Sequence, residues 1–136
     1  MPAKTAMKHM QRSEHTEQVY VCQWLRRRGI IHCSIPNGAP MSFTQRAYMV
    51  AEGLTKGFPD LLIFNKPNKS YKARDVKGRE CDLLYCGVAL EMKREFGGVQ
   101  SEAQKICQKA LEENSWLYIL AHGADEAIKE LTKLGY

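Results

Sequence analysis

The sequence lacks the features that mark a membrane or secreted protein. No stretch of its 136 residues approaches the roughly 18 consecutive apolar residues that a membrane-spanning helix needs. Lys4, Lys8 and Arg12 near the start are not followed by the apolar core of a signal peptide. We therefore expect a protein of the cytoplasm with no membrane partner.

Paired cysteines and repeats are also missing. The five cysteines are odd in number and form no CxxC pair, which argues against a disulfide framework and a zinc ribbon. The four histidines show no metal-binding spacing such as HxxxH, and no internal repeat or low-complexity tract occurs. The residue types left for a metal site are therefore carboxylates.

The composition is that of one ordinary globular domain. Hydrophobic residues make up 44% of the chain and charged residues 26%. The formal net charge of +5 suits a polyanionic partner without requiring one. We expect a single domain over residues 1–136, with residues 1–12 as a flexible basic segment.

Apolar periodicity and turn residues give the order of the expected elements. Helices are expected over 14–28, 43–52, 100–113 and 125–134, and strands over 30–35, 61–64, 83 or 88–93, and 116–121. Residues 65–82 contain six Lys or Arg and few apolar anchors, so we expect an exposed loop there. This order predicts an α/β fold with a small mixed central sheet flanked by helices.

Three residues at strand ends carry the chemistry. Asp60 follows Pro59 and opens one expected strand, while Glu91 and Lys93 close the next. Residues two apart in a strand share a face, so Glu91 and Lys93 project together and Met92 points away. Two carboxylates about 4 Å apart repel by roughly 4 kcal/mol at an effective dielectric near 20, and a divalent cation reverses that cost. Oxygen ligands favour Mg²⁺ or Mn²⁺, which act on phosphodiesters.

Several ordered blocks resemble the virus-type replication-repair nuclease (VRR-NUC) domain of the PD-(D/E)xK superfamily. They are SEHTEQVYVCQWLRRRG, IPNGAP, AEGLTKGFPDLLIF and GVALEMKREFGGVQSEAQK. The resemblance covers nearly the whole chain and implies a restriction-endonuclease-like core. It also implies a metal-dependent endodeoxyribonuclease of the stand-alone phage or bacterial type, acting in a bacterial cell or a phage-infected host.

The resemblance also assigns roles to residues. Asp60, Glu91 and the backbone carbonyl of Met92 would bind the metal, and Lys93 would be the catalytic lysine. An acidic residue on the first helix usually completes such a site; Glu14 matches that position better than Glu17, because with Gln18 it is expected on the inward face. The alternative for Glu14 is a carboxylate that only favours the positive end of its helix. Gln104 would reach toward the site.

Further residues are candidates for DNA contacts. They are Asn37, Lys56, Lys69, Lys72, Arg74, Lys77, Arg94 and Gln100. A basic loop can follow a DNA backbone, with each neutralised phosphate adding about 0.9 to the salt dependence. A turn-forming Asn, solvated cations and surface glutamines are the structural alternatives.

Three functions remain open. The first is a structure-selective nuclease similar to Holliday junction resolvases, working as a homodimer on branched DNA. A two-fold symmetric junction needs two sites, and one small domain carries one. The second is a flap, nick or less selective DNA nuclease of replication and repair. The third is a catalytically silent DNA-binding module, in which acids facing phosphate would serve no purpose.

Overall fold

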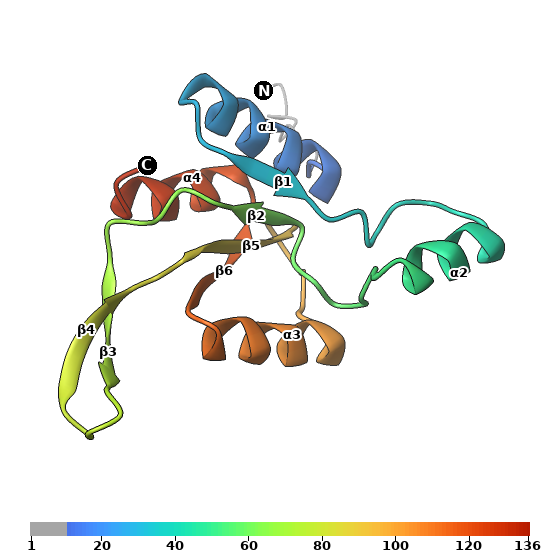
Figure 1. Ribbon diagram of the computed structural model, residues 1–136. Helices are drawn as coiled ribbons and strands as arrows, with labels where there is room; N and C mark the ends of the chain where they lie inside the picture. Colours follow the sequence, from blue (N-terminus) through green and yellow to red (C-terminus); the bar gives the residue numbers. More distant parts are fainter. Residues whose placement is uncertain (1–10) are drawn as a thin grey trace, which may run out of the picture.

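Helices cover both faces of a four-stranded sheet in the computed structural model, which describes residues 11–136 (Figure 1). The strands lie in the order β1 (His32–Ser34), β2 (Leu61–Ile63), β5 (Gly87–Lys93) and β6 (Trp116–His122). β1–β2 and β2–β5 are antiparallel, and β5–β6 are parallel. The predicted mixed sheet flanked by helices is confirmed.

The core divides into two layers because side chains of β5 alternate between faces. Val88, Leu90 and Met92 pack on the side of α1 (Glu14–Arg27) and α4 (Ala124–Lys133). Ala89 packs on the opposite side, with Tyr118 of β6 and Leu111 of α3 (Glu102–Glu113). All seven residues of β5 are buried, so this strand is a rigid base for the residues at its end.

The second helix, α2 (Phe43–Ala51), stands away from the sheet (Figure 1). The Ser42 hydroxyl accepts from the Gln45 N–H, and the Gln45 side chain accepts from the Ser42 N–H, which forms a capping box. None of its residues is buried. Local hydrogen bonding, rather than core packing, defines this helix.

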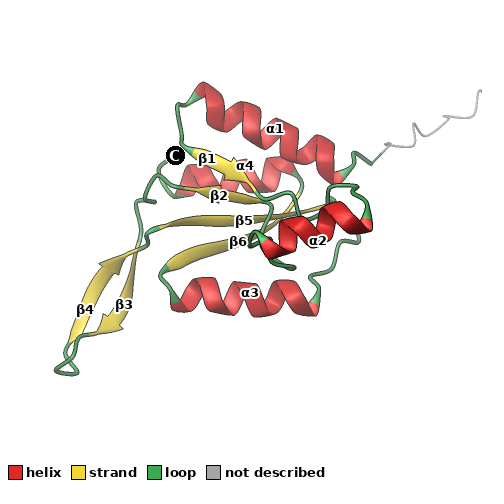
Figure 2. Ribbon diagram, turned by 45° about the vertical axis from the view of Figure 1, so that its right-hand side comes forward, coloured by secondary structure: helices red, strands yellow, loops and turns green. Residues whose placement is uncertain are grey.

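The prediction of an exposed loop over residues 65–82 is wrong, because a β-hairpin occupies most of this segment. β3 (Ser70–Arg74) pairs with β4 (Glu80–Leu84) and extends beyond the sheet (Figure 2). The Asp75 carboxylate accepts from the N–H groups of Lys77 and Arg79 and fixes the turn. Because alternate positions are charged and solvated, the strands show little apolar periodicity in the sequence.

Residues 1–10 lie outside the described part of the chain, and most of the segment expected to be flexible falls there. Of its last two residues, Gln11 donates to the Phe96 carbonyl and Arg12 pairs with Glu17 at 3.0 Å. Within residues 11–136, no helix combines the length and apolar character that a membrane span requires.

Candidate active site

The residues predicted to carry chemistry meet at one end of the sheet. Leu61 of β2 lies opposite Leu90 of β5, so the antiparallel register places Asp60 opposite Glu91. The Met92 N–H donates to Asp60 Oδ2 at 2.7 Å and fixes that carboxylate. This hydrogen bond joins residues that are 32 positions apart in the sequence.

Strand alternation directs Glu91 and Lys93 to the face covered by α3. Met92 lies between them with its side chain in the opposite layer of the core. Glu91 is 3% exposed and Lys93 is 8% exposed. A carboxylate and an ammonium group are therefore held together in a nearly dry environment.

Gln104 of α3 connects the two groups. Its Nε2 donates to Glu91 Oε1 at 2.5 Å, and its Oε1 accepts from Lys93 Nζ at 3.0 Å. The same Oε1 also accepts from the Ser101 N–H at 2.8 Å, as part of the capping box that begins α3. Lys93 Nζ lies 3.5 Å from Glu91 Oε1. Gln104 therefore takes part in capping the N-terminus of α3 and also orients Glu91 and Lys93.

Burial and the charge of the neighbouring carboxylate disfavour the ionised forms of Asp60 and Glu91 when no metal ion is bound. Burial, with the nearby Asp60 charge, raises the pKa of Glu91 to about 8, although Lys93 opposes the rise. Burial also raises the pKa of Asp60, although the Met92 N–H opposes it. Both carboxylates would be stabilised as anions by an added positive charge.

The donor set fits a hard divalent cation. Glu91 Oε2 is buried and has no hydrogen-bond partner among residues 11–136, which is costly for a carboxylate. In a strand the N–H and C=O of one residue point to the same edge, so the Met92 carbonyl faces the side of Asp60. Over the described range, no three His, Cys, Asp or Glu side chains gather into a metal-binding group. The fit therefore rests on two carboxylates and a carbonyl.

Glu14 and Glu17 occupy different places, and the expected inward face of α1 needs correction. Glu17, with Val21 and Leu25, is buried, whereas Glu14 is exposed and Gln18 is half-buried. Burial is the main cause of the raised pKa values of Asp60 and Glu91, and the charge of Glu14 adds a smaller contribution. Glu14 and Asp60 line one cavity of about 540 Å³, together with residues 34–36 and 38–40. The role of Glu14 as a ligand stays a prediction.

Glu17 instead caps another helix. Its Oε2 accepts from the Ala124 N–H at 2.6 Å, and its Oε1 pairs with Arg12. The N-cap residue of α4 is Gly123, which has no side chain to satisfy that N–H. A buried carboxylate from α1 supplies the missing acceptor, so both of its oxygens are engaged away from Glu91.

The candidate DNA-contacting residues separate into two groups. Arg94 and Lys56 are exposed, and Arg94 directly follows Lys93. Asn37 donates to the Thr55 carbonyl at 2.8 Å, and Gln100 donates to Gln108 and to the Tyr118 hydroxyl. These two side chains already have local structural partners.

The second group is at the other end of β5. Lys69, Lys72, Arg74 and Lys77 lie on or beside the β3–β4 hairpin, which precedes the first residue of β5, whereas Lys93 is its last (Figure 1). Lys72 pairs with Asp82 across the hairpin at 2.9 Å. Within one chain, the hairpin and the carboxylate pair are not brought together.

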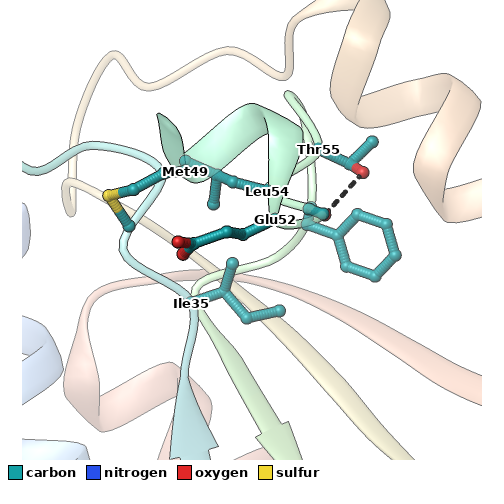
Figure 3. Close-up of a pocket in the computed structure, with 7 residues that line it drawn as sticks. Ile35, Met49, Glu52, Leu54 and Thr55 are labelled. Atoms are coloured by element: carbon teal, nitrogen blue, oxygen red, sulfur yellow. Dashed lines mark hydrogen bonds between the residues drawn. The ribbon is translucent and has the colours of Figure 1, made fainter. Parts of the chain in front are cut away.

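A cavity of about 380 Å³ lies apart from the carboxylate pair (Figure 3). Ile35, Met49, Leu54 and Phe58 give it an apolar lining, and the Glu52 carboxylate extends into it. It contains none of Asp60, Glu91 or Lys93.

Two supporting features were missed from the sequence. The Ser101-x-x-Gln104 spacing is a capping-box signal, and it would have fixed the rotation of α3 over the site. The Met92 N–H that holds Asp60 has no sequence signal, because any strand residue carries the same group.

Comparison with known proteins yields a structural match. No protein-family model matches the chain, and no curated protein matches it in sequence. A solved structure described as "VRR_NUC domain protein" superposes with a TM-score of 0.62, at 22% sequence identity, over 91% of this chain and 88% of the other. The carboxylate pair therefore lies in a chain with the fold of a VRR_NUC domain protein, as the sequence resemblance predicted.

Proposed function

We propose that this protein is a divalent-metal-dependent DNA endonuclease that hydrolyses phosphodiester bonds at Asp60, Glu91 and Lys93. The observation that carries the proposal is the buried Glu91 carboxylate, whose Oε2 lacks a partner among the described residues. A second carboxylate stands opposite it and an ammonium group beside it. Such a combination is costly as a structural feature and useful for binding a cation against phosphate. The shared fold with a VRR_NUC domain protein supports the same proposal.

Asp60, Glu91 and the Met92 carbonyl would hold Mg²⁺ or Mn²⁺, and Glu14, which lines the same cavity as Asp60, would be a further acidic ligand. When bound, such an ion lowers the pKa of water and offsets the charge of the scissile phosphate. The protein keeps the ligands in place through the Met92 N–H and Gln104. Burial on β5 limits competition from solvent.

Lys93 supplies a positive charge where negative charge develops. Its Nζ is held by Gln104 Oε1 at 3.0 Å and lies 3.5 Å from Glu91 Oε1. An ammonium group has three donors, so one remains for a phosphate oxygen or for the attacking water. Arg94 and Lys56, both exposed, would contact the DNA backbone.

Branched DNA is the substrate we propose first, with two copies of the chain acting as a homodimer. A four-way junction has two-fold symmetry, and each chain carries one candidate site. Flaps and nicks are the second candidate substrates. A silent DNA-binding module is disfavoured by the buried acids, because acids facing phosphate weaken binding unless a cation intervenes.

The test is cleavage of labelled DNA by the purified protein. Four-way junction, flap, nicked, single-stranded and linear duplex DNA are incubated with Mg²⁺, with Mn²⁺ and with EDTA. We expect metal-dependent cutting, lost at least 100-fold in Lys93→Ala, by analogy with removal of one transition-state donor. Lys105→Ala is the matched control, since Lys105 lies on α3 but pairs only with the exposed Glu102.

The pattern of cutting assigns the substrate. Preferential cutting of the junction supports the resolvase-like function, and cutting of flaps or nicks alone moves the assignment to the second candidate. Binding without cutting in either metal would contradict the proposed activity and favour the silent module.

A further inference from the structure

The outer edge of β6 is unusually open for the edge of a sheet. β1, the opposite edge, has three residues, His32, Cys33 and Ser34, which is the short edge that proteins normally tolerate. β6 has seven residues, WLYILAH, with no Lys, Glu, Asp, Arg or Pro to discourage pairing. A long apolar edge of this kind is a template for another strand.

The direction of the backbone groups shows what this edge offers. The Gly123 N–H donates to the Lys93 carbonyl, and the Ser115 carbonyl accepts from the Cys86 N–H, so odd-numbered residues face the β5 side. The even-numbered residues therefore turn their N–H and C=O groups outward. The His122 N–H is satisfied by Glu126. Tyr118 and Leu120 are left at the centre of the edge, with no backbone partner recorded within residues 11–136.

Charges along this edge are self-complementary for an antiparallel arrangement. A cavity of about 450 Å³ follows β6, and its charged residues are Lys69, Glu126, Glu130 and Lys133. Lys133 pairs with Glu130 at 2.9 Å, which leaves Lys69 and Glu126 as the charges available to a partner. Glu126 lies at the start of α4, beside the end of β6, whereas Lys133 lies at the end of α4. Lys69 is held near that same end, because the Asn68 N–H donates to the Leu134 carbonyl. A two-fold axis across β6 would set Glu126 of one copy against Lys69 of the other.

The position of the β3–β4 hairpin gives the pairing a functional consequence. The Tyr71 hydroxyl hydrogen-bonds to the Ser115 hydroxyl at 2.5 Å, which ties the hairpin to the start of β6. The candidate active site lies at the other end, where Lys93 pairs in register with His122. Antiparallel pairing of two β6 strands would bring the hairpin of one copy to the active-site end of the other. Figures 1 and 2 show the hairpin extending beyond the sheet.

We propose that two copies of this chain pair antiparallel through their β6 edges, and that the basic hairpin of each copy contacts DNA bound at the active site of the other. The occupant of the edge is thus a second copy of this chain. The role of the hairpin rests on the proposed nuclease function, whereas the pairing does not. In the register with full overlap, Ile119 of one copy lies opposite Ile119 of the other.

Two cysteine variants test the register. Ile119 is odd-numbered, so it forms a pair without mutual hydrogen bonds, whose Cα atoms are about 4.5 Å apart and within reach of a disulfide. We expect Ile119→Cys to give a covalent dimer under mild oxidation. Leu117→Cys is the matched control: two copies of Leu117 would be separated by roughly 13 Å along the strands, at 3.3 Å per residue. Wild-type protein, with its five free cysteines, gives the background.

Sedimentation tests the association itself. We expect wild-type protein to sediment as a dimer at micromolar concentration. A monomer would overturn the proposal, and so would a dimer in which Leu117→Cys cross-links as well as Ile119→Cys. Thermal melting followed by circular dichroism confirms that both variants fold, and the half-buried positions make the two losses of packing comparable.

Mixing two inactive variants tests the sharing of the hairpin. Lys93→Ala lacks the proposed catalytic lysine, and the double variant Arg74→Gln with Lys77→Gln lacks two hairpin cations while leaving Lys69 at the β6 edge unchanged. Arg74 donates a long hydrogen bond of 3.5 Å to the Gly78 carbonyl, and the Lys77 side chain has no partner among the described residues, so the fold should tolerate both changes. Each mixed dimer would carry one complete site, so we expect nicking to recover to about one quarter of the wild-type level after random exchange.

These experiments test the β6 pairing and the shared active site separately. No recovery on mixing, or full activity of the hairpin variant alone, would overturn the shared site. If wild-type protein cuts no DNA, the proposed function fails, and sedimentation with cross-linking still decides whether the β6 edges pair.

Discussion

Replacing Glu91 by Gln should change how the stability of the metal-free protein depends on pH. Glu91 has its pKa raised from 4.5 to about 8 by burial and by the Asp60 charge. The folded state therefore retains a proton that the unfolded state releases between these pH values. By linkage, the free energy of unfolding falls as pH rises through this window. A neutral Gln, which can still accept from Gln104, removes this dependence.

The magnitude follows from the size of the pKa change. Each pKa unit corresponds to 1.36 kcal/mol, so the full rise in the pKa of Glu91 is equivalent to about 5 kcal/mol of unfolding free energy. Reducing this value by about half, to allow for solvent screening, leaves about 2 kcal/mol. A domain of this size has an unfolding entropy of about 0.29 kcal/mol/K at about 2.1 cal/mol/K per residue. The Tm of wild type should thus fall by about 7 °C more than that of the variant between pH 5 and pH 8.

Circular dichroism melts in EDTA at half-unit pH steps provide the assay. Subtracting the Tm of Glu91→Gln from that of wild type at each pH removes the contribution of the histidines and other groups that titrate in both proteins. Parallel Tm curves for the two proteins would refute the account, because they would show that Glu91 ionises as readily in the folded protein as in water.

Three further substitutions test individual contacts. Glu17→Ala should lower the free energy of unfolding by about 1–3 kcal/mol in denaturant melts, because the Ala124 N–H loses its acceptor. The folded variant should keep its nuclease activity. Loss of metal binding with unchanged stability would contradict the capping role. Gly98→Ala should reduce cleavage more than 10-fold at little cost in affinity for DNA, because a Cβ there would lie 2.8 Å from Lys93 Cβ; unchanged kcat would contradict this. Gln104→Ala should lower both stability and kcat, whereas a change in stability alone would limit Gln104 to capping α3.

The fold was predictable where the sequence has continuous apolar runs. β5 buries all seven of its residues and β2 two of three, and β6 is apolar although most of its residues are half-buried, so the positions of these strands along the chain could be inferred directly. The β3–β4 hairpin was missed because its register is set by cross-strand pairs and by the Asp75 turn, with few apolar side chains to reveal it.

The site was predictable only in part. The two-residue spacing of Glu91 and Lys93 fixes their common face, and the sheet register brings Asp60 to them. The sequence analysis preferred Glu14 to Glu17 on an expected inward face of α1, whereas the structure buries Glu17 and leaves Glu14 exposed. Glu17 accepts a hydrogen bond from the N-terminus of α4, whose N-cap residue has no side chain to do so. Helical spacing could not reveal this contact, because α4 begins more than a hundred residues further along the chain.

The most direct test of the central claim is whether Asp60 and Glu91 bind a divalent cation. Isothermal titration of the protein with Mn²⁺ at pH 8, where both carboxylates can release their protons, should give saturable binding in wild type. Asp60→Asn should abolish that binding while leaving the fold intact, as judged by circular dichroism. Equal binding by wild type and Asp60→Asn, or no binding by either at millimolar Mn²⁺, would contradict the assignment of this carboxylate pair as a metal-dependent active site.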